Sequence, residues 1–306
     1  MIRPRPSKDG TPWSERPFGK ALVIGNPIAG RGRGKDAARE TCEGLRSLGI
    51  ATDLFMTSQR RDALRRVRTM DADTELVVSV GGDGTLSEVL GGLVNRDVPV
   101  AQLPLGTANV LAQELGLPRD VDGLLDVVRQ RRTSTLDTAL VDGRLTFLCV
   151  GSGIDGSAVA EVEARRKGPI SYFSYVTAIA RVLRNYRPPR LKLEIDGEPV
   201  AGEFGFVLVS NVREYGGFFH LSSKCRRDDS RVEVYAARSG SVPHLMRLAA
   251  TATLQELPGR IADFWQARRV VVHAPDDQPY QVDGDLGGRG SFTYEVSDAR
   301  YEILIP

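Results

Sequence analysis

Cysteine is scarce in this sequence, whose 306 residues include only Cys42, Cys149 and Cys225. Their number is odd, and their spacing matches neither a disulfide framework nor a zinc site. The three histidines lie far apart and follow no metal-ligand spacing either. These absences exclude a disulfide-stabilised secreted domain and favour a protein of the reducing cytoplasm.

Long hydrophobic runs and an excess of one charge are also missing. No apolar run reaches the ~18 residues that a membrane-spanning helix needs. Residues 1–18 contain Arg, Pro and Ser but no apolar core, so we expect a flexible polar arm there and no signal peptide. The 41 Lys and Arg residues nearly balance the 39 Asp and Glu residues, which argues against a dedicated nucleic-acid binder.

The first half of the chain alternates short apolar strands with helical stretches. Strands are expected at 21–25, 52–56, 76–80 and 99–103. The helices between and after them are expected to end near Leu48, Met70, Leu93 and Leu115, and one more covers 121–130 with Asp120 as its N-cap. This repetition predicts an α/β domain with a doubly wound parallel sheet over residues 19–135.

After residue 135 the pattern changes to short strands and tight turns. Asp-Gly pairs stand at 142–143, 196–197 and 283–284, and Gly readily accepts the positive φ of a hairpin turn. Strands are expected at 136–141, 145–150, 191–195, 204–210, 232–236, 269–273, 280–282 and 301–305, and helices at 172–185 and 242–254. The pattern predicts a mainly antiparallel β domain over residues 136–306, whose last strand can return to the first domain.

Three glycine-containing loops follow strands of the first domain. The first, residues 26–35, fits neither a Walker A motif nor GxGxxG, but its small residues before a helix would expose N–H groups that suit phosphate. The alternative is a flexible basic turn. Because loops after parallel strands gather at one sheet edge, we expect the three to lie together.

The second loop, Gly81 to Thr85, places three glycines around Asp83, so that the backbone can approach a ligand beside a carboxylate. Alternatively, Thr85 and Glu88 form a capping box that starts the next helix. The third loop, residues 104–109, is expected to be a further wall of a nucleotide site. The alternative is a helix start, with Thr107 as its cap and Asn109 as a helix-start residue.

Together, these motifs resemble those of the diacylglycerol kinase catalytic-domain family, which includes soluble bacterial lipid kinases and the sphingosine and ceramide kinases. The matching segments are Asn26-Pro27 with Gly30, Val80 to Val89, and Pro104 to Thr107 with Asn109. The resemblance continues at residues 151–155, 187–189 and 282–285, and it covers nearly the whole chain beyond the N-terminal arm.

The resemblance implies an ATP- and Mg²⁺-dependent kinase that phosphorylates a hydroxyl of diacylglycerol or a related lipid, with ATP bound between an α/β domain and a β-sandwich domain. The positions that match nucleotide-binding residues are Asn26, Pro27, Gly30, Thr57, Gly82, Asp83, Gly84, Thr85, Glu88 and Thr107. Asp83 and Asp137 match acids near the phosphates that act through Mg²⁺, and Asp285 stands at the position of the catalytic base.

Two positions of the proposed site depart from the family pattern. Asp285 stands where the bacterial lipid kinases have Glu, so the carboxylate is kept on a side chain one methylene shorter. The alternative is that Asp283-Gly284-Asp285 is only a polar hairpin turn. Val110 stands where many members have Asp, next to the third loop.

The family also has a structural Mg²⁺ held by a short acidic loop. The matching ligands would be Asp229 and the main-chain oxygens of Arg226 and Arg231. Here Ser230 follows the Asp pair, where the family usually has Gly.

Residues 165–190 interleave Arg and Lys with four aromatic residues. Such a segment contacts anionic lipid head groups, or is a solvated helix whose aromatics face the core. We expect a cytoplasmic protein, peripheral to the inner membrane face, that meets a lipid substrate at the membrane surface and binds no nucleic acid; exposed sheet edges permit a homodimer.

Two other functions remain open from the residues alone. NAD kinases share Gly-Gly-Asp-Gly-Thr after a strand, although their Asn-Thr-Asp-Gly type of partner motif is missing here. The departures at Asp285 and Val110 also fit a nucleotide- or lipid-binding regulator with little turnover.

Overall fold

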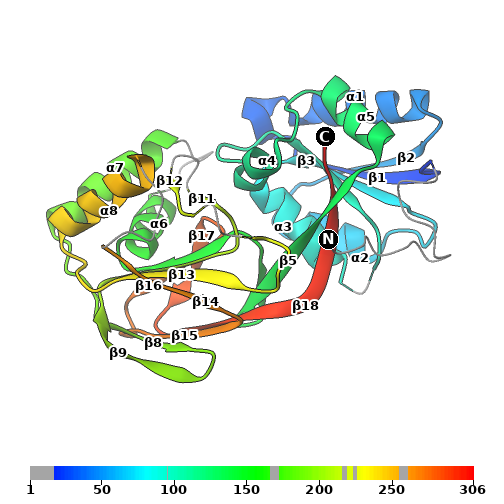
Figure 1. The fold of residues 1–306 in the computed structure, drawn as a ribbon. Helices are drawn as coiled ribbons and strands as arrows, with labels where there is room; N and C mark the ends of the chain where they lie inside the picture. Colours follow the sequence, from blue (N-terminus) through cyan, green and yellow to red (C-terminus); the bar gives the residue numbers. More distant parts are fainter. Residues whose placement is uncertain (1–16, 95, 166–171, 216–218, 223–225, 255–260) are drawn as a thin grey trace. The chain divides into compact units, whose positions relative to one another are not determined.

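The computed structural model describes residues 17–94, 96–165, 172–215, 219–222, 226–254 and 261–306 (Figure 1). Most of the N-terminal arm expected at 1–18 lies outside these ranges, and Phe18 is buried. The chain forms two compact units, one of Met1–Leu136 with Ala299–Pro306 and one of Asp137–Asp298. No helix in the described ranges is long and apolar enough to cross a membrane.

The first unit is a parallel sheet between helices, in the strand order β2-β1-β3-β4 with the end of β18 beside β4. Its strands are β1 (Lys20–Gly25), β2 (Ala51–Met56), β3 (Leu76–Gly81) and β4 (Val100–Pro104). Its helices are η1 (Ala29–Gly32), α1 (Gly34–Ser47), α2 (Asp62–Arg68), α3 (Asp83–Gly92), α4 (Val110–Leu115) and α5 (Val121–Gln130). The predicted doubly wound α/β fold is confirmed.

The core of this unit explains where the helices lie. Helices α1 and α5 cover one face of the sheet through residues such as Cys42, Leu45 and Leu124, while α2 and α3 pack together on the other face (Figure 1). Asp120 caps α5 as predicted, since its Oδ1 accepts a hydrogen bond from the Gly123 N–H at 2.8 Å.

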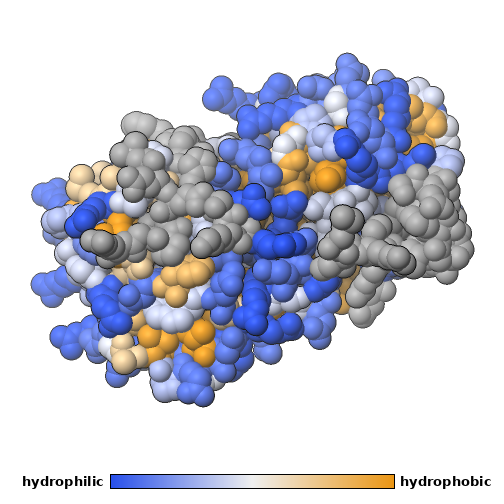
Figure 2. Space-filling model, viewed as in Figure 1, coloured by the Kyte–Doolittle hydropathy of each residue, from blue (hydrophilic) through white to orange (hydrophobic). Residues whose placement is uncertain are grey.

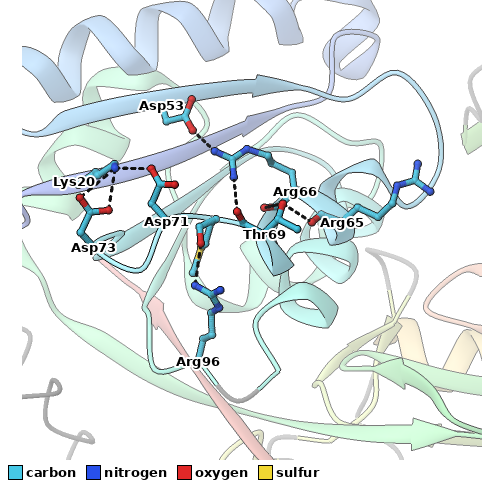
Figure 3. A network of polar contacts seen from close by, with 9 residues as sticks. Lys20, Asp53, Arg65, Arg66, Thr69, Asp71, Asp73 and Arg96 are labelled. Atoms are coloured by element: carbon cyan, nitrogen blue, oxygen red, sulfur yellow. Dashed lines mark hydrogen bonds and ion pairs between the residues drawn. The ribbon is translucent and has the colours of Figure 1, made fainter.

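A polar network ties α2 and its flanking turns to the sheet (Figure 3). Lys20 of β1 contacts Asp71 at 2.7 Å and Asp73 at 2.9 Å. Arg66 of α2 pairs with Asp53 of β2, and Arg96 donates to the Met70 carbonyl at 3.2 Å. These pairs are partly exposed, so they contribute modest stability and mainly orient α2.

The second unit is a β-sandwich, as predicted. One sheet is antiparallel, in the order β14 (Asp263–Ala267), β13 (Val232–Ala237), β10 (Phe206–Ser210), β7 (Cys149–Ser152), β16 (Pro279–Val282) and β17 (Asp285–Arg289). The other contains β18 (Phe292–Leu304), β15 (Arg269–His273), β8 (Leu191–Ile195) and β9 (Glu198–Phe204), with β5 (Thr133–Val141) and β6 (Arg144–Thr146) paired beside β18. The sandwich core includes Val207, Val234 and Phe292.

The remaining elements of this unit are three helices and a short strand pair. They are α6 (Ile154–Ala164), α7 (Tyr172–Arg184), α8 (Val242–Leu254), β11 (Glu214–Tyr215) and β12 (Phe219–His220). Strand β18 runs through both units, because its residues from Ala299 onward belong to the first.

All three Asp-Gly pairs form two-residue hairpin turns, as predicted. The φ angles are 48° and 83° at 142–143, 52° and 92° at 196–197, and 52° and 82° at 283–284. The flanking residues pair directly in each hairpin, so the turns set the registers of β5–β6, β8–β9 and β16–β17.

Three expectations for the second unit differ from the structure. The strand expected at 204–210 is divided at Gly205 between the end of β9 and β10. The single strand expected at 145–150 is two strands, β6 and β7, which pair with different neighbours and are separated by Phe147 and Leu148. Helix α6 was not expected at all. It packs on β16 so closely that a Cβ on Gly156 would lie 2.1 Å from the Pro279 carbonyl oxygen. A glycine at such a contact weakens the helical signal in the sequence.

Candidate active site

The three glycine-containing segments meet at the carboxyl ends of β1, β3 and β4. The Gly30 N–H donates to the Leu105 carbonyl at 2.8 Å, and the Leu105 N–H donates to the Gly81 carbonyl at 2.9 Å. The Asn26 side chain links the first segment to the second, since its Nδ2 lies 3.4 Å from Oγ1 of Thr85. The three segments therefore form one continuous edge of the first unit.

Glycine is required where these segments touch. A Cβ on Gly106 would lie 2.6 Å from Cα of Gly82, and a Cβ on Gly34 would lie 1.9 Å from the Asn26 carbonyl oxygen. Gly84, in contrast, is exposed and faces open space. The edge thus combines a tightly packed base with an open outer side, where a ligand can approach the backbone.

Asp83 lies in the first turn of α3 and not in a loop. Its Oδ2 accepts a hydrogen bond from the Val110 N–H at 3.0 Å, which links the starts of α3 and α4. The N-cap of α3 is Gly82, and no side chain caps it. The capping-box alternative is therefore wrong, because Thr85 lies inside the helix.

Glu88 has a different partner from the one its local sequence suggested. Its Oε1 accepts from the Arg61 N–H at 2.7 Å, and its Oε2 accepts from the Ala63 N–H at 3.2 Å. The carboxylate thus satisfies main-chain donors at the start of α2. Sequence spacing could not indicate this, because these residues are 27 and 25 positions away.

Asn109, not Thr107, precedes α4. Asn109 adopts a left-handed φ of 49°. Its Oδ1 accepts a hydrogen bond from the Gly106 N–H at 2.8 Å, and its Nδ2 donates one to the Gly106 carbonyl at 2.9 Å. Thr107 is exposed on the resulting loop. Thr57 follows β2 and donates its N–H to the Gly25 carbonyl at 2.9 Å, so it lies at the same edge as the first segment.

Asp137 belongs to the second unit, where it holds the 226–231 loop. Its N–H donates to the Arg227 carbonyl at 2.7 Å, and its Oδ2 accepts from the Ser230 N–H. Ser230 adopts a φ of 58°, which explains why glycine suits this position. The Arg231 N–H bonds Oδ1 of Asp229 at 3.0 Å, so the loop is a tight turn around that carboxylate.

Over the described ranges, no three His, Cys, Asp or Glu side chains form a cluster that could hold a metal ion. A cation at the 226–231 loop would therefore depend on main-chain oxygens beside Asp229, which is compatible with the donor preference of Mg²⁺.

Asp283 is the first residue of the β16–β17 turn, and its carboxylate is buried. Oδ1 accepts from Thr146 Oγ1 at 2.6 Å and from two main-chain N–H groups, those of Leu148 at 3.0 Å and Cys149 at 3.1 Å. Oδ2 accepts from the Phe147 N–H at 3.2 Å. Burial raises the pKa of Asp283, and these four hydrogen bonds act in the opposite direction. The turn is thus a built element and more than a polar hairpin.

Asp285 begins β17 and stays accessible, with 43% of its side chain exposed. Its Oδ2 lies 3.5 Å from Nη2 of Arg144, at the start of β6. A half-exposed carboxylate on a fixed hairpin can exchange a proton with a substrate.

Asp155, at the start of α6, has a buried carboxylate to which the sequence motifs assigned no role. The Tyr215 hydroxyl donates to its Oδ1, and a Cβ on Gly151 would lie 1.8 Å from its Oδ2. Burial raises the pKa of Asp155. Gly151 stands four residues before Asp155 in the segment 151–155. This spacing is the sequence feature that could have indicated the close contact between them.

Comparison with known proteins matches both units. Residues 20–141 match the diacylglycerol kinase catalytic domain, and residues 148–305 match the YegS C-terminal NAD kinase beta sandwich-like domain. A diacylglycerol kinase of Bacillus subtilis (strain 168) is 26% identical over 274 residues, covering 88% of this chain and 90% of the relative. One from Staphylococcus carnosus (strain TM300) is 25% identical over 293 residues, covering 94% and 95%.

A solved structure of a diacylglycerol kinase from Bacillus anthracis str. Sterne has the same fold. Its TM-score is 0.72 at 16% identity, over 94% of this chain and 97% of that one. The fold and the paired domains define a phosphotransferase of the lipid kinase class. This chain belongs to the diacylglycerol kinase catalytic-domain family.

Proposed function

We propose that this enzyme transfers the γ-phosphate of ATP, with Mg²⁺, to a hydroxyl group of diacylglycerol or a related lipid. The observation that carries the proposal is the glycine-lined edge with Asp83 at the start of α3, in a chain with both domains of the family. The relatives from B. subtilis and S. carnosus are named diacylglycerol kinases, which supports a diacylglycerol-like acceptor.

The glycine-lined edge of the first unit supports the nucleotide part of the proposal. Gly82 and Gly106 leave no room for side chains at the base, while Gly84 faces open space. The residues proposed to hold ATP here are Asn26, Pro27, Gly30, Thr57, Gly82, Asp83, Gly84, Thr85, Glu88 and Thr107. Bound Mg²⁺ would neutralise phosphate charge, and Asp83 and Asp137 are proposed to hold it.

The second unit supplies the base and the lipid contacts in this proposal. Asp285 accepts the proton of the lipid hydroxyl as that oxygen attacks the γ-phosphorus, while the bond to the bridging oxygen breaks and ADP leaves. The half-exposed side chain and the fixed turn before it support this role. The 226–231 loop, through Asp229 and the carbonyls of Arg226 and Arg231, is proposed as the structural Mg²⁺ site, because Asp137 and Ser230 hold it as a tight turn.

We further propose that the enzyme works in the cytoplasm and contacts the inner membrane face through α7. Val176 and Ile179 are 47% and 40% exposed, and Arg181 and Arg184 of the same helix are exposed as well. Figure 2 shows hydrophobic residues at the surface over α7 and α8, among hydrophilic ones. Apolar side chains beside basic ones suit an anionic bilayer. A homodimer through one of the sheet edges is part of the same proposal.

The membrane contact predicts weaker vesicle binding when α7 loses its exposed apolar side chains. The double variant Val176→Ser, Ile179→Ser is expected to partition about 10- to 100-fold less onto phosphatidylglycerol-containing vesicles. Fully burying one such side chain stabilises by about 1.5–3 kcal/mol, and a little under half of each of these two is exposed and left to bury. Sedimentation with vesicles measures this. Val94→Ser is the matched control, because Val94 is 47% exposed in the first unit. Equal binding by both variants would remove α7 from the contact.

The proposed function is tested by transfer of label from γ-³²P-ATP to a vesicle panel. The panel contains diacylglycerol, a sphingoid base, phosphatidylglycerol and an isoprenoid alcohol, with NAD in a parallel reaction. Label on a lipid is expected. Label on NAD alone would favour the NAD kinase alternative, and Mg·ATP binding without any labelled acceptor would favour a regulator.

A further inference from the structure

Two Asp-Gly hairpins of the second unit, β5–β6 and β16–β17, are locked to each other. The Asp283 carboxylate binds Thr146 and the three N–H groups that follow it, as described above. In the other direction, the Tyr280 hydroxyl of β16 donates to Oδ2 of Asp142 at 3.1 Å. Asp142 also accepts from the Thr293 N–H at 3.1 Å, which holds the first hairpin on β18.

Arg144, next to the first of these turns, reaches the second. Its Nη1 lies 3.3 Å from the Leu286 carbonyl, and its Nη2 lies 3.5 Å from the Val282 carbonyl. The same Nη2 lies 3.5 Å from Oδ2 of Asp285. The guanidinium thus spans the carbonyls on both sides of the turn and contacts the carboxylate between them.

The backbone before Asp285 is held by two further hydrogen bonds. Tyr175 of α7 donates its hydroxyl to the Gly284 carbonyl at 3.1 Å, and the Gly284 N–H donates to Oε1 of Gln281 at 2.8 Å. With the main chain fixed, the freedom that remains is rotation of the Asp285 side chain. Within the described residues, Arg144 is the one ion-pair partner of that side chain, and no hydrogen bond reaches its Oδ1.

We propose that Arg144 is a positioning residue for the catalytic base: it binds Oδ2 of Asp285 and leaves Oδ1 to take the proton of the acceptor hydroxyl. The inference rests on the proposed function, in which Asp285 is the base. It also gives a physical reason why aspartate serves here: the shorter side chain has fewer rotatable bonds, and a contact from Nη2 of Arg144 to Oδ2 is enough to orient the carboxylate.

The test compares Arg144→Gln with Arg289→Gln. Arg289 lies on β17, the strand that begins with Asp285, but donates to the Asp277 carbonyl, so its variant is a control for loss of a guanidinium near this hairpin. Arg144→Gln is expected to lower kcat about 10- to 100-fold, the scale for a misplaced catalytic group. The KM for ATP is expected to stay within about 2-fold, because Arg144 contacts only the base and the hairpin.

Two further measurements separate positioning from a structural role. In an Asp285→Asn background, Arg144→Gln is expected to lower kcat by less than about 2-fold further. The reason is that the effects of residues that act as a unit are not additive. Guanidinium ion at millimolar concentration is expected to restore part of the kcat of Arg144→Ala, which it could not do if the variant were simply misfolded.

The outcomes distinguish this inference from the function it rests on. If Asp285→Asn keeps wild-type turnover, Asp285 is not the base, and both the base assignment and the role of Arg144 fall. If Asp285→Asn is inactive but Arg144→Gln behaves like Arg289→Gln, the role of Arg144 alone is overturned. Loss of kcat with full additivity and no guanidinium rescue would also overturn it.

Discussion

Replacing Asp83 by asparagine is expected to reduce lipid phosphorylation roughly 100- to 1,000-fold, the loss typical of removing one preorganised electrostatic contact. The variant should remain folded, because an asparagine Oδ1 can still accept the Val110 N–H that links α3 to α4. The charge that would hold Mg²⁺ is lost, while the shape of the edge is kept. Initial rates of label transfer and thermal unfolding measure the two effects.

Asp120 provides the control, since it is also an acid at a helix start in the first unit. Its carboxylate caps α5. Asp120→Ala is expected to lower the free energy of unfolding by about 1 kcal/mol and to leave turnover unchanged. A folded Asp83→Asn protein with wild-type rates would remove Asp83 from the proposed mechanism.

Replacing Asp283 by alanine is expected to lower the free energy of unfolding by about 4 kcal/mol or more, because three buried N–H groups and a hydroxyl lose their acceptor and each unsatisfied group costs about 1–3 kcal/mol. The three N–H groups belong to Phe147, Leu148 and Cys149, between β6 and β7. Urea unfolding measures the change as a lower midpoint at a similar slope.

Asp196→Ala is the matched control for this variant. Asp196 has the same φ of 52° in the same kind of turn, so both substitutions carry the same backbone strain. It is exposed, although its Oδ1 accepts from the N–H groups of Arg268 and Arg269 at 2.8 Å. The excess loss in Asp283→Ala therefore reports the buried carboxylate. Equal losses in the two variants would contradict that interpretation.

The elements that could be predicted are those governed by local chemistry. The Asp-Gly turns at 142–143, 196–197 and 283–284 were predicted because glycine at positive φ is a property of two adjacent residues. Strands β8 and β15 and helix α8 were predicted to the residue, since their apolar periodicity is complete. The gathering of the three glycine-containing segments followed from parallel strand order alone.

The errors arise where a distant contact overrides a local pattern. Thr85 and Glu88 have the spacing of a capping box, yet Glu88 binds donors at the start of α2 and α3 begins at Asp83. Glycine before Asp83 suggested a loop, although a helix N-terminus tolerates it. Helix α6 lacked a clear apolar stripe because its Gly156 lies against the backbone of β16.

The amino-acid pattern was enough to define the two folds, the hairpin turns and the glycine-lined edge, because periodicity, turn dihedrals and parallel connections act over a few residues at a time. The hydrogen-bond and ion-pair partners of the acidic side chains, in contrast, are determined only by the tertiary structure. Asp283 meets donors 134 to 137 residues away, and Arg144 meets Asp285 across 141 residues. Such pairs depend on how strands stack and which carboxylates become buried, and no short stretch of sequence encodes either.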